Sequence, residues 1–205
     1  MKNTDTHPTI YLCRHGDTAW SPERRLAGHT DIPLAEIGRT NAVQLGARLR
    51  PLHFDLVLVS PLLRARETAQ LAGYGDSAVI DARLKEMNFG RYEGSTTEEI
   101  RQNEPGWTYL RDGAPDGDTP RSLAARVDSL LEDLRRQGGR FLIFGHSVIS
   151  RVMTARWLGQ PPEFGRNLML SPGAISVLAY DPVEDAPAIA TWNDRHHLSG
   201  QDSFA

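Results

Sequence analysis

Short apolar runs alternate along the chain with segments in which apolar residues recur at helical spacing. Three of the runs, at residues 9–13, 55–59 and 141–144, are mainly apolar and are followed by turn-forming or polar residues. Runs of this kind are typical of buried β-strands. Residues 174–180 and 188–192 have the same character, and a turn rich in Pro, Asp and Glu joins them. The pattern therefore predicts five strands.

Helical periodicity separates the first three of these runs. The apolar positions are Gly38, Ala42, Leu45 and Leu49 in one helix, and Leu123, Val127, Leu130, Leu131 and Leu134 in another. Thr119 followed by Pro120 predicts the N-cap and first turn of the second helix, and Ser60 with Pro61 predicts the same for a helix that carries Arg64. Alternating strands and helices predict an α/β three-layer sandwich with a mostly parallel central sheet flanked by helices.

The segment 94–118 interrupts this alternation. Its Pro and Gly residues, at 105, 106, 113, 115 and 117, favour loops and short helices over a long regular element. We expect a short lid excursion here, which Trp107 and Tyr109 either line or pack, within a single domain that spans residues 1–205. A chain of this length buries roughly 70% of its unfolded surface, so its core does not depend on a disulfide or a metal.

Composition narrows the class of partner and the compartment. The net charge is −3 without a block of like charges, so a nucleic-acid partner, which favours a basic face, is not expected. No apolar run approaches the ~18 residues of a membrane span, and the polar N-terminus lacks the apolar core of a signal peptide. A single cysteine, Cys13, fits a reducing compartment. We expect a cytoplasmic protein without a membrane partner, either a monomer or a homodimer.

Basic residues follow three of the predicted strands. Arg14 and His15 follow the first, Arg64 lies just after the second, and His146 follows the third. The carboxyl ends of neighbouring parallel strands meet at one edge of the sheet, where α/β folds bind their ligands. Free backbone N–H groups at the starts of the following helices also favour an anion. The sequence therefore predicts a pocket for a compact, doubly charged anion, and phosphate is the commonest such ligand.

Five ordered motifs give the chain a family resemblance. They are RHGDT at 14–18, GHTDIPL at 28–34, SPLLRA at 60–65, GRYEG at 90–94 with Glu86 just upstream, and GH at 145–146. The set resembles the signature of the histidine phosphatase superfamily, also called the phosphoglycerate mutase-like family, over nearly the whole chain. Residues 90–119 and the Asn193–Asp194 pair are most similar to its acid phosphatase and sugar-bisphosphate phosphatase subgroup.

The resemblance implies a role for each residue of the site. His15 is the nucleophile: one imidazole nitrogen attacks phosphorus, and a backbone carbonyl holds the other. Arg14, Arg64 and a protonated His146 surround the equatorial phosphate oxygens. Glu86 is the acid that protonates the leaving group and then the base that activates water. Because three cations and the nucleophile replace a metal, neither a metal nor a cofactor is expected.

Substrate contacts are expected from the same residues and from their neighbours. Gly16 and Gly28 let the backbone approach the phosphate closely. Ser21 stands where many family members have an asparagine, and Ser147 replaces the usual glycine and adds a hydroxyl. Phe89 replaces a tyrosine that helps mutases to bind phosphoglycerate, which argues against that chemistry. The expected substrate-binding set is Arg14, Gly16, Ser21, Gly28, Arg64, Glu86, His146 and Ser147.

These features predict a metal-independent hydrolase that acts on a small phosphorylated metabolite, a sugar phosphate or bisphosphate, through a phosphohistidine. A phosphoglycerate-type mutase is the alternative in the same family, although the short segment 94–118 favours hydrolysis. A serine hydrolase that uses Ser147, with Asp194 and His196 as partners, is less favoured. Ile149 occupies the last glycine position of the G-x-S-x-G motif in that interpretation.

Overall fold

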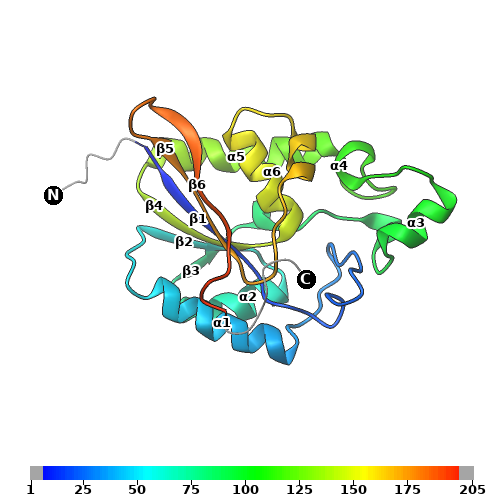
Figure 1. Cartoon of the computed structure of the whole chain (residues 1–205), viewed down its shortest axis with the longest axis horizontal. Helices are drawn as coiled ribbons and strands as arrows, with labels where there is room; N and C mark the ends of the chain where they lie inside the picture. The colour runs from blue at the N-terminus through cyan, green and yellow to red at the C-terminus, as the bar shows by residue number, and fades with distance from the viewer. Residues whose placement is uncertain (1–6, 199–205) are drawn as a thin grey trace.

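The alternating pattern folds into one twisted sheet with helices on both faces (Figure 1). The computed structural model describes residues 7–198. Its strands are β1 (Thr9–Arg14), β2 (Leu56–Val59), β3 (Ala78–Ile80), β4 (Arg140–Gly145), β5 (Ile175–Asp181) and β6 (Ala186–Asp194). In the described residues they form a six-stranded sheet in the order β3-β2-β4-β1-β5-β6. Strands β1 to β4 are parallel, and β5 and β6 add an antiparallel edge.

Helices on the two sides of the sheet complete three layers. The α-helices are α1 (Glu36–Leu49), α2 (Leu63–Leu71), α3 (Thr97–Asn103), α4 (Tyr109–Asp112), α5 (Pro120–Gln137) and α6 (Ser147–Trp157). Short 3₁₀ helices are η1 (Ala82–Leu84), η2 (Gly90–Tyr92) and η3 (Pro162–Asn167). Figure 1 shows α1 and α2 on one face of the sheet and α5 and α6 on the other. The predicted fold class is confirmed.

The alternation of side chains along β4 explains why both faces are covered. Phe141 and Ile143 are buried in one apolar cluster with α5 and α6, whereas Leu142 and Phe144 are buried in a second cluster with α1 and α2. Successive side chains of a strand point to opposite faces, so a continuous apolar strand needs a helix layer on each side. The central strands therefore hold the sheet between two separate cores.

One predicted helix cap is correct and the other is wrong. Thr119 caps α5: its hydroxyl accepts a hydrogen bond from the backbone N–H of Ser122. Ser60 does not cap α2, because that helix begins at Leu63, too far along the chain for the Ser60 side chain to serve as its N-cap. The Asp31 carboxylate accepts from the backbone N–H of Leu63 at 2.6 Å instead. A residue distant in sequence thus supplies the anion that stabilises this helix end.

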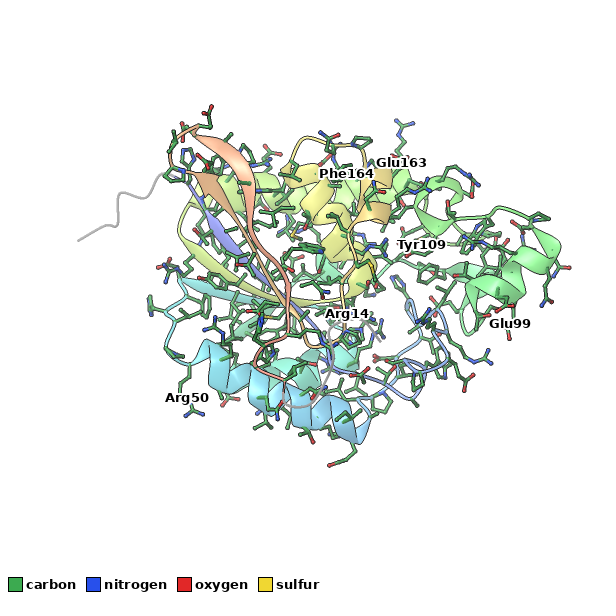
Figure 2. All side chains as sticks on the ribbon, viewed as in Figure 1. Arg14, Arg50, Glu99, Tyr109, Glu163 and Phe164 are labelled. Carbon is green, nitrogen blue, oxygen red and sulfur yellow. The ribbon has the colours of Figure 1, made fainter. Side chains whose placement is uncertain are left out.

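The segment 94–118 consists of loops and short helices, as its Pro and Gly residues predicted. It contains α3, whose start is fixed by a capping box between Thr96 and Glu99, and the single turn α4. Trp107 is buried, and its indole N–H donates to the carbonyl of Gly113 at 3.0 Å. Figure 2 shows Glu99 far out on this excursion, with Tyr109 nearer to the sheet. Its action as a lid stays a prediction.

The sequence pattern missed β3, since its three residues are too few to display a period. Strand β3 pairs only with β2 in the described sheet, and its Val79 and Ile80 are more than half exposed. Among residues 7–198, no helix combines the length and the apolar character needed to cross a membrane.

Candidate active site

The order of the strands brings the predicted site residues together. Strand β4 lies between β1 and β2, so the carboxyl ends of these three parallel strands are adjacent. The backbone N–H of His15 donates to the carbonyl of Gly145 at 3.0 Å, and that of Ser60 donates to the carbonyl of Phe144 at 3.0 Å. The segments that carry His15, Arg64 and His146 therefore emerge side by side, as the sequence predicted.

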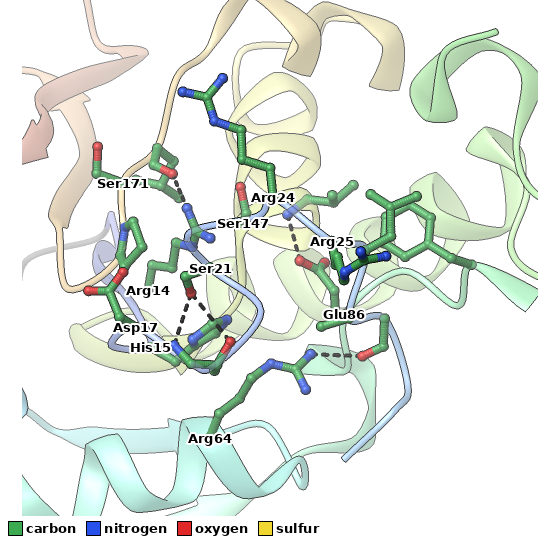
Figure 3. Close-up of a pocket in the computed structure, with 18 of the residues that line it drawn as sticks. Arg14, His15, Asp17, Ser21, Arg24, Arg25, Arg64, Glu86, Ser147 and Ser171 are labelled. Atoms are coloured by element: carbon green, nitrogen blue, oxygen red, sulfur yellow. Dashed lines mark hydrogen bonds between the residues drawn. The ribbon is translucent and has the colours of Figure 1, made fainter. Parts of the chain in front are cut away.

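A cavity of about 650 Å³ opens at this edge of the sheet (Figure 3). Seven of the predicted site residues line it: Arg14, His15, Ser21, Gly28, Arg64, Glu86 and Ser147. Asp17, Arg24, Arg25, Phe89, Tyr109 and the segment 169–172 also contribute to its wall. Both its size and its mixed polar and apolar wall suit a small metabolite.

His15 is a neutral ring, and one of its two nitrogens takes part in a hydrogen bond. The carbonyl of Gly16 lies 2.7 Å from Nδ1, so it accepts a hydrogen bond from a protonated Nδ1 and leaves the lone pair on Nε2. The residue is 7% exposed. Burial, and then the charges of Arg64 and Arg14, hold the pKa of His15 well below its usual 6.5. The ring is therefore unprotonated at neutral pH, with a free lone pair on Nε2.

Arg14, which is half-buried, and Arg64, which is buried, supply two cations beside His15. Burial lowers the pKa of Arg14 to about 10, which still leaves it protonated at neutral pH, and its guanidinium donates to the carbonyl of Leu170. Arg64 donates to the carbonyls of Gly28 at 2.7 Å and Thr30 at 3.0 Å. These carbonyls fix the Arg64 fork in place, so it needs little reorganisation when an anion binds.

Glu86 is positioned by the start of α6. One carboxylate oxygen accepts from the backbone N–H groups of Met87 at 2.9 Å and Ile149 at 3.0 Å, and the other accepts from Val148 at 3.0 Å. The backbone carbonyl of Glu86 lies 3.1 Å from Nε2 of His29. Glu86 is only 6% exposed, and three backbone N–H donors fix its side chain on the cavity wall. Sequence alone links Glu86 to none of these partners.

His146 was predicted to be a cation, but its surroundings in the structure favour the neutral ring. The ring is fully buried, and its centroid lies 5.1 Å from that of His15. Burial, and then the charges of Arg64 and Arg14, hold the pKa of His146 well below 6.5. Its Nε2 lies 2.7 Å from the hydroxyl of Ser60, and its Nδ1 has no hydrogen-bond partner within the described part of the chain. In this structure His146 is a neutral ring next to His15, and it is not part of the cavity lining that the described residues form.

Of the two glycines and two serines in the predicted substrate-binding set, Gly28, Ser21 and Ser147 line the cavity and Gly16 does not. Gly16 packs against α1: a Cβ there would lie 2.5 Å from the carbonyl oxygen of Gly38, so close backbone contact with the helix explains this glycine. Gly28 lines the cavity with a φ of +38°. Ser21 lines it while accepting from the backbone N–H of Thr18 at 2.9 Å, and Ser147 lines it from the first position of α6.

Sequence reasoning did not single out several residues of the wall. The segment 169–172 lies there because β5 runs antiparallel to β1, which puts the residues before β5 beside the end of β1. The backbone N–H of Gly173 donates to the carbonyl of His15 at 3.1 Å. Arg24 and Arg25 lie in the loop 18–26, and two adjacent arginines so close to the RHGDT motif are a signal that the sequence does carry.

Acid should destabilise the folded protein because His15 and His146 are buried as neutral rings. In the unfolded chain both histidines have an ordinary pKa near 6.5. Below that pH the unfolded state binds more protons than the folded state, so the free energy of unfolding falls as the pH drops from 6.5 toward the lower folded pKa values. Each histidine contributes a slope of at most about 1.4 kcal/mol per pH unit.

Urea unfolding at a series of pH values from 7.5 to 5.5 measures this slope. The variant His146→Gln retains an amide opposite Ser60 and removes one ring with a lowered pKa, whereas His197, whose pKa burial also lowers, remains. The slope of this variant should therefore be shallower than that of the parent protein by up to about 1.4 kcal/mol per pH unit. A slope unchanged by His146→Gln would contradict a neutral, buried His146 as a source of the acid sensitivity.

The fold is α/β, and it places a cavity lined by Arg14, His15 and Arg64 at the carboxyl ends of the parallel strands. The chain belongs to the histidine phosphatase superfamily: the family model for branch 1 matches residues 10–195. This is the family that the five motifs predicted, and the predicted enzyme class, histidine phosphatase, is confirmed with it.

Individual relatives are similar over most of their length. The chain is 34% identical to an acid phosphatase of Mycobacterium tuberculosis, over 84% of this chain and 86% of that protein. It is 33% identical to a probable phosphoglycerate mutase, GpmB, of Escherichia coli, over 83% and 84% of the two chains. A solved structure of an open reading frame product of Mycobacterium tuberculosis matches with a TM-score of 0.85 and 31% identity, over 90% of this chain and 96% of that one.

Proposed function

We propose that this enzyme hydrolyses phosphate monoesters of small metabolites, without a metal ion, through a phosphohistidine formed at His15. The observation that carries the proposal is the state of His15, a neutral ring whose Nδ1 is committed to Gly16 and which lines a cavity beside Arg14 and Arg64. A free Nε2 lone pair next to two fixed cations suits attack on a phosphate dianion. A similar relative is an acid phosphatase, which agrees with hydrolysis.

The proposed reaction has two displacements. In the first, Nε2 of His15 bonds to phosphorus, the bond from phosphorus to the ester oxygen breaks, and Glu86 protonates the leaving oxygen. In the second, water attacks phosphorus, Glu86 takes its proton, and the phosphorus–nitrogen bond breaks. Inorganic phosphate leaves, with His15 neutral and Glu86 protonated again. Arg14 and Arg64 offset the charge on the equatorial oxygens in both displacements.

His146 contributes a hydrogen bond rather than a third positive charge in this proposal. Its neutral ring, 5.1 Å from the ring of His15, has an Nδ1 without a partner in residues 7–198. A buried nitrogen without a partner costs free energy, and a hydrogen bond to a phosphate oxygen or from a neighbouring donor removes that cost. Arg14 and Arg64 therefore provide the positive charge next to His15 in this proposal.

Two alternatives make different predictions. A mutase, the activity named for one similar relative, would return the phosphate to the substrate and release an isomer. A serine hydrolase would need a base beside Ser147. His196 binds Asp194 at 2.7 Å with its own side chain 97% exposed, and in the described residues no hydrogen bond joins Ser147 to either. The geometry supports the phosphatase over this second alternative.

Phosphate release in the presence of a chelator tests the proposal. A panel of sugar phosphates, sugar bisphosphates, phosphoglycerates and p-nitrophenyl phosphate should yield inorganic phosphate at rates that EDTA changes by less than about twofold, since arginines do the work of a metal. Isomerised substrate without free phosphate would favour the mutase. Activity that appears only after a divalent metal is restored would contradict the metal-independent mechanism.

A further inference from the structure

Arg24 has a backbone conformation that arginine rarely adopts. Its φ is +54°, in the left-handed region that glycine and, among other residues, asparagine and aspartate prefer. Hydrogen bonds on both sides fix this turn: Arg24 N–H donates to the carbonyl of Ser21 at 3.1 Å, and Arg25 N–H donates to that of Trp20 at 3.2 Å. Backbone strain of this kind clusters at ligand sites, where the side chain has a task.

The guanidinium of Arg24 is exposed and lines the cavity. Within residues 7–198, no carboxylate forms an ion pair with it. The adjacent Arg25 is engaged, because it binds Glu23 at 2.7 Å, Glu99 at 3.4 Å and the carbonyl of Gly94 at 2.8 Å. Two neighbouring arginines thus differ: Arg25 ties the loop to the excursion, and Arg24 presents its donors to the cavity.

Arg24 lies apart from the cations that surround His15. In the view of Figure 3, Arg14, His15 and Arg64 occupy one end of the cavity, and the Arg24 side chain extends past Ser147 toward the other end. The wall also includes the apolar or aromatic side chains of Phe89, Tyr109, Leu170 and Met169. A substrate whose phosphate lies against His15 would extend along this wall toward Arg24.

The geometry points to Arg24 as a specificity-determining residue that binds a second anionic group, a carboxylate or a second phosphate, on a phosphomonoester substrate. The planar guanidinium fork matches both oxyanions with two parallel hydrogen bonds. The preferred substrate class is then a small metabolite with two anionic groups, rather than a neutral sugar monophosphate. This inference rests on the proposed function, because it assumes that the transferred phosphate lies at His15.

Matched substrate pairs test the inference. The substrate 3-phosphoglycerate differs from glycerol 3-phosphate by a carboxylate in place of a hydroxymethyl group, and fructose 1,6-bisphosphate differs from fructose 6-phosphate by a second phosphate. The ratio of kcat/KM within each pair measures recognition of the second anion. We expect the ratio to favour the doubly anionic member in at least one pair, and the pair that does so identifies the second group as carboxylate or phosphate.

The variant Arg24→Asn removes the charge with a residue that tolerates the left-handed conformation. It should lower the ratio in the favoured pair by about tenfold, mainly through KM, because the lost contact binds the substrate and its transition state alike. The variant Arg24→Gly, which also suits this backbone, should behave in the same way, and Arg24→Lys should be intermediate. Arg121→Gln removes an exposed arginine elsewhere and should leave the ratio unchanged.

The outcomes separate the two proposals. Release of phosphate that depends on His15, with ratios that Arg24→Asn and Arg24→Gly leave unchanged, would overturn the role of Arg24 and leave the proposed function intact. An equal loss of kcat/KM on both members of a pair would also overturn the role of Arg24, because a general defect in catalysis does not distinguish the two substrates. Absence of phosphate release dependent on His15 from all four compounds would contradict the proposed function itself.

Discussion

The variant His15→Ala should lose more than about 10³-fold in turnover and form no acid-labile phosphoenzyme. His15 is the proposed nucleophile: its ring is neutral, its Nδ1 hydrogen-bonds to the carbonyl of Gly16, and its Nε2 keeps a free lone pair. Alanine removes that lone pair and leaves Arg14 and Arg64 in place, so substrate binding should persist. Rapid quench into alkali, in which phosphohistidine is stable, after mixing with a labelled phosphate ester measures the phosphoenzyme, and loss of the label on later acid treatment shows that the bond is acid-labile.

Two other histidines serve as controls for the labelled position. His53 is exposed and far from the cavity wall, so His53→Ala should retain both turnover and label. His146 lies 5.1 Å from His15, and the label in His146→Gln should still map to His15. Label on His146, or appreciable residual turnover in His15→Ala, would exclude His15 as the covalent nucleophile.

The variant Glu86→Gln should lose about 10²–10⁴-fold on alkyl phosphates and much less on p-nitrophenyl phosphate. An alkoxide leaving group needs a proton as the phosphorus–oxygen bond breaks, whereas p-nitrophenolate leaves without one. The carboxyl group of Glu86 lies on the cavity wall, where backbone N–H groups of the first turn of α6 position it. Steady-state kcat/KM of the variant and the parent enzyme, measured on both classes of ester, shows whether the loss is larger on the alkyl phosphates.

A structural effect accompanies this substitution and must be separated from it. The carboxylate accepts three backbone N–H groups, from Met87, Val148 and Ile149, whereas the NH₂ group of glutamine turns a donor toward at least one of them. Each unsatisfied buried donor costs about 1–3 kcal/mol, so Glu86→Gln should also unfold at lower urea concentration. An equal loss on both esters would assign Glu86 a purely structural role and remove it as the acid.

Local patterns were sufficient for the elements and for most of the candidate residues. Strand and helix periods depend on neighbours within a few positions, so the runs at 9–13, 55–59 and 141–144 and the helix after Thr119 are found close to their predicted places. The chain order of these elements also implied a parallel sheet whose ends gather Arg14, His15 and Arg64. Short β3 escaped prediction because a three-residue strand carries no period.

What the sequence determined by itself is the family, the α/β architecture and the identity of the chemical groups, because these depend on residue types in a fixed order. The tertiary structure decided their states. Burial beside arginines makes His146 neutral, Asp31 rather than Ser60 meets the start of α2, and the antiparallel β5 delivers the segment 169–172 to the wall. Arg24 faces the cavity through a turn with a φ of +54°. Each of these depends on contacts between distant parts of the chain, and solvation and neighbouring charge are set only when those parts pack together.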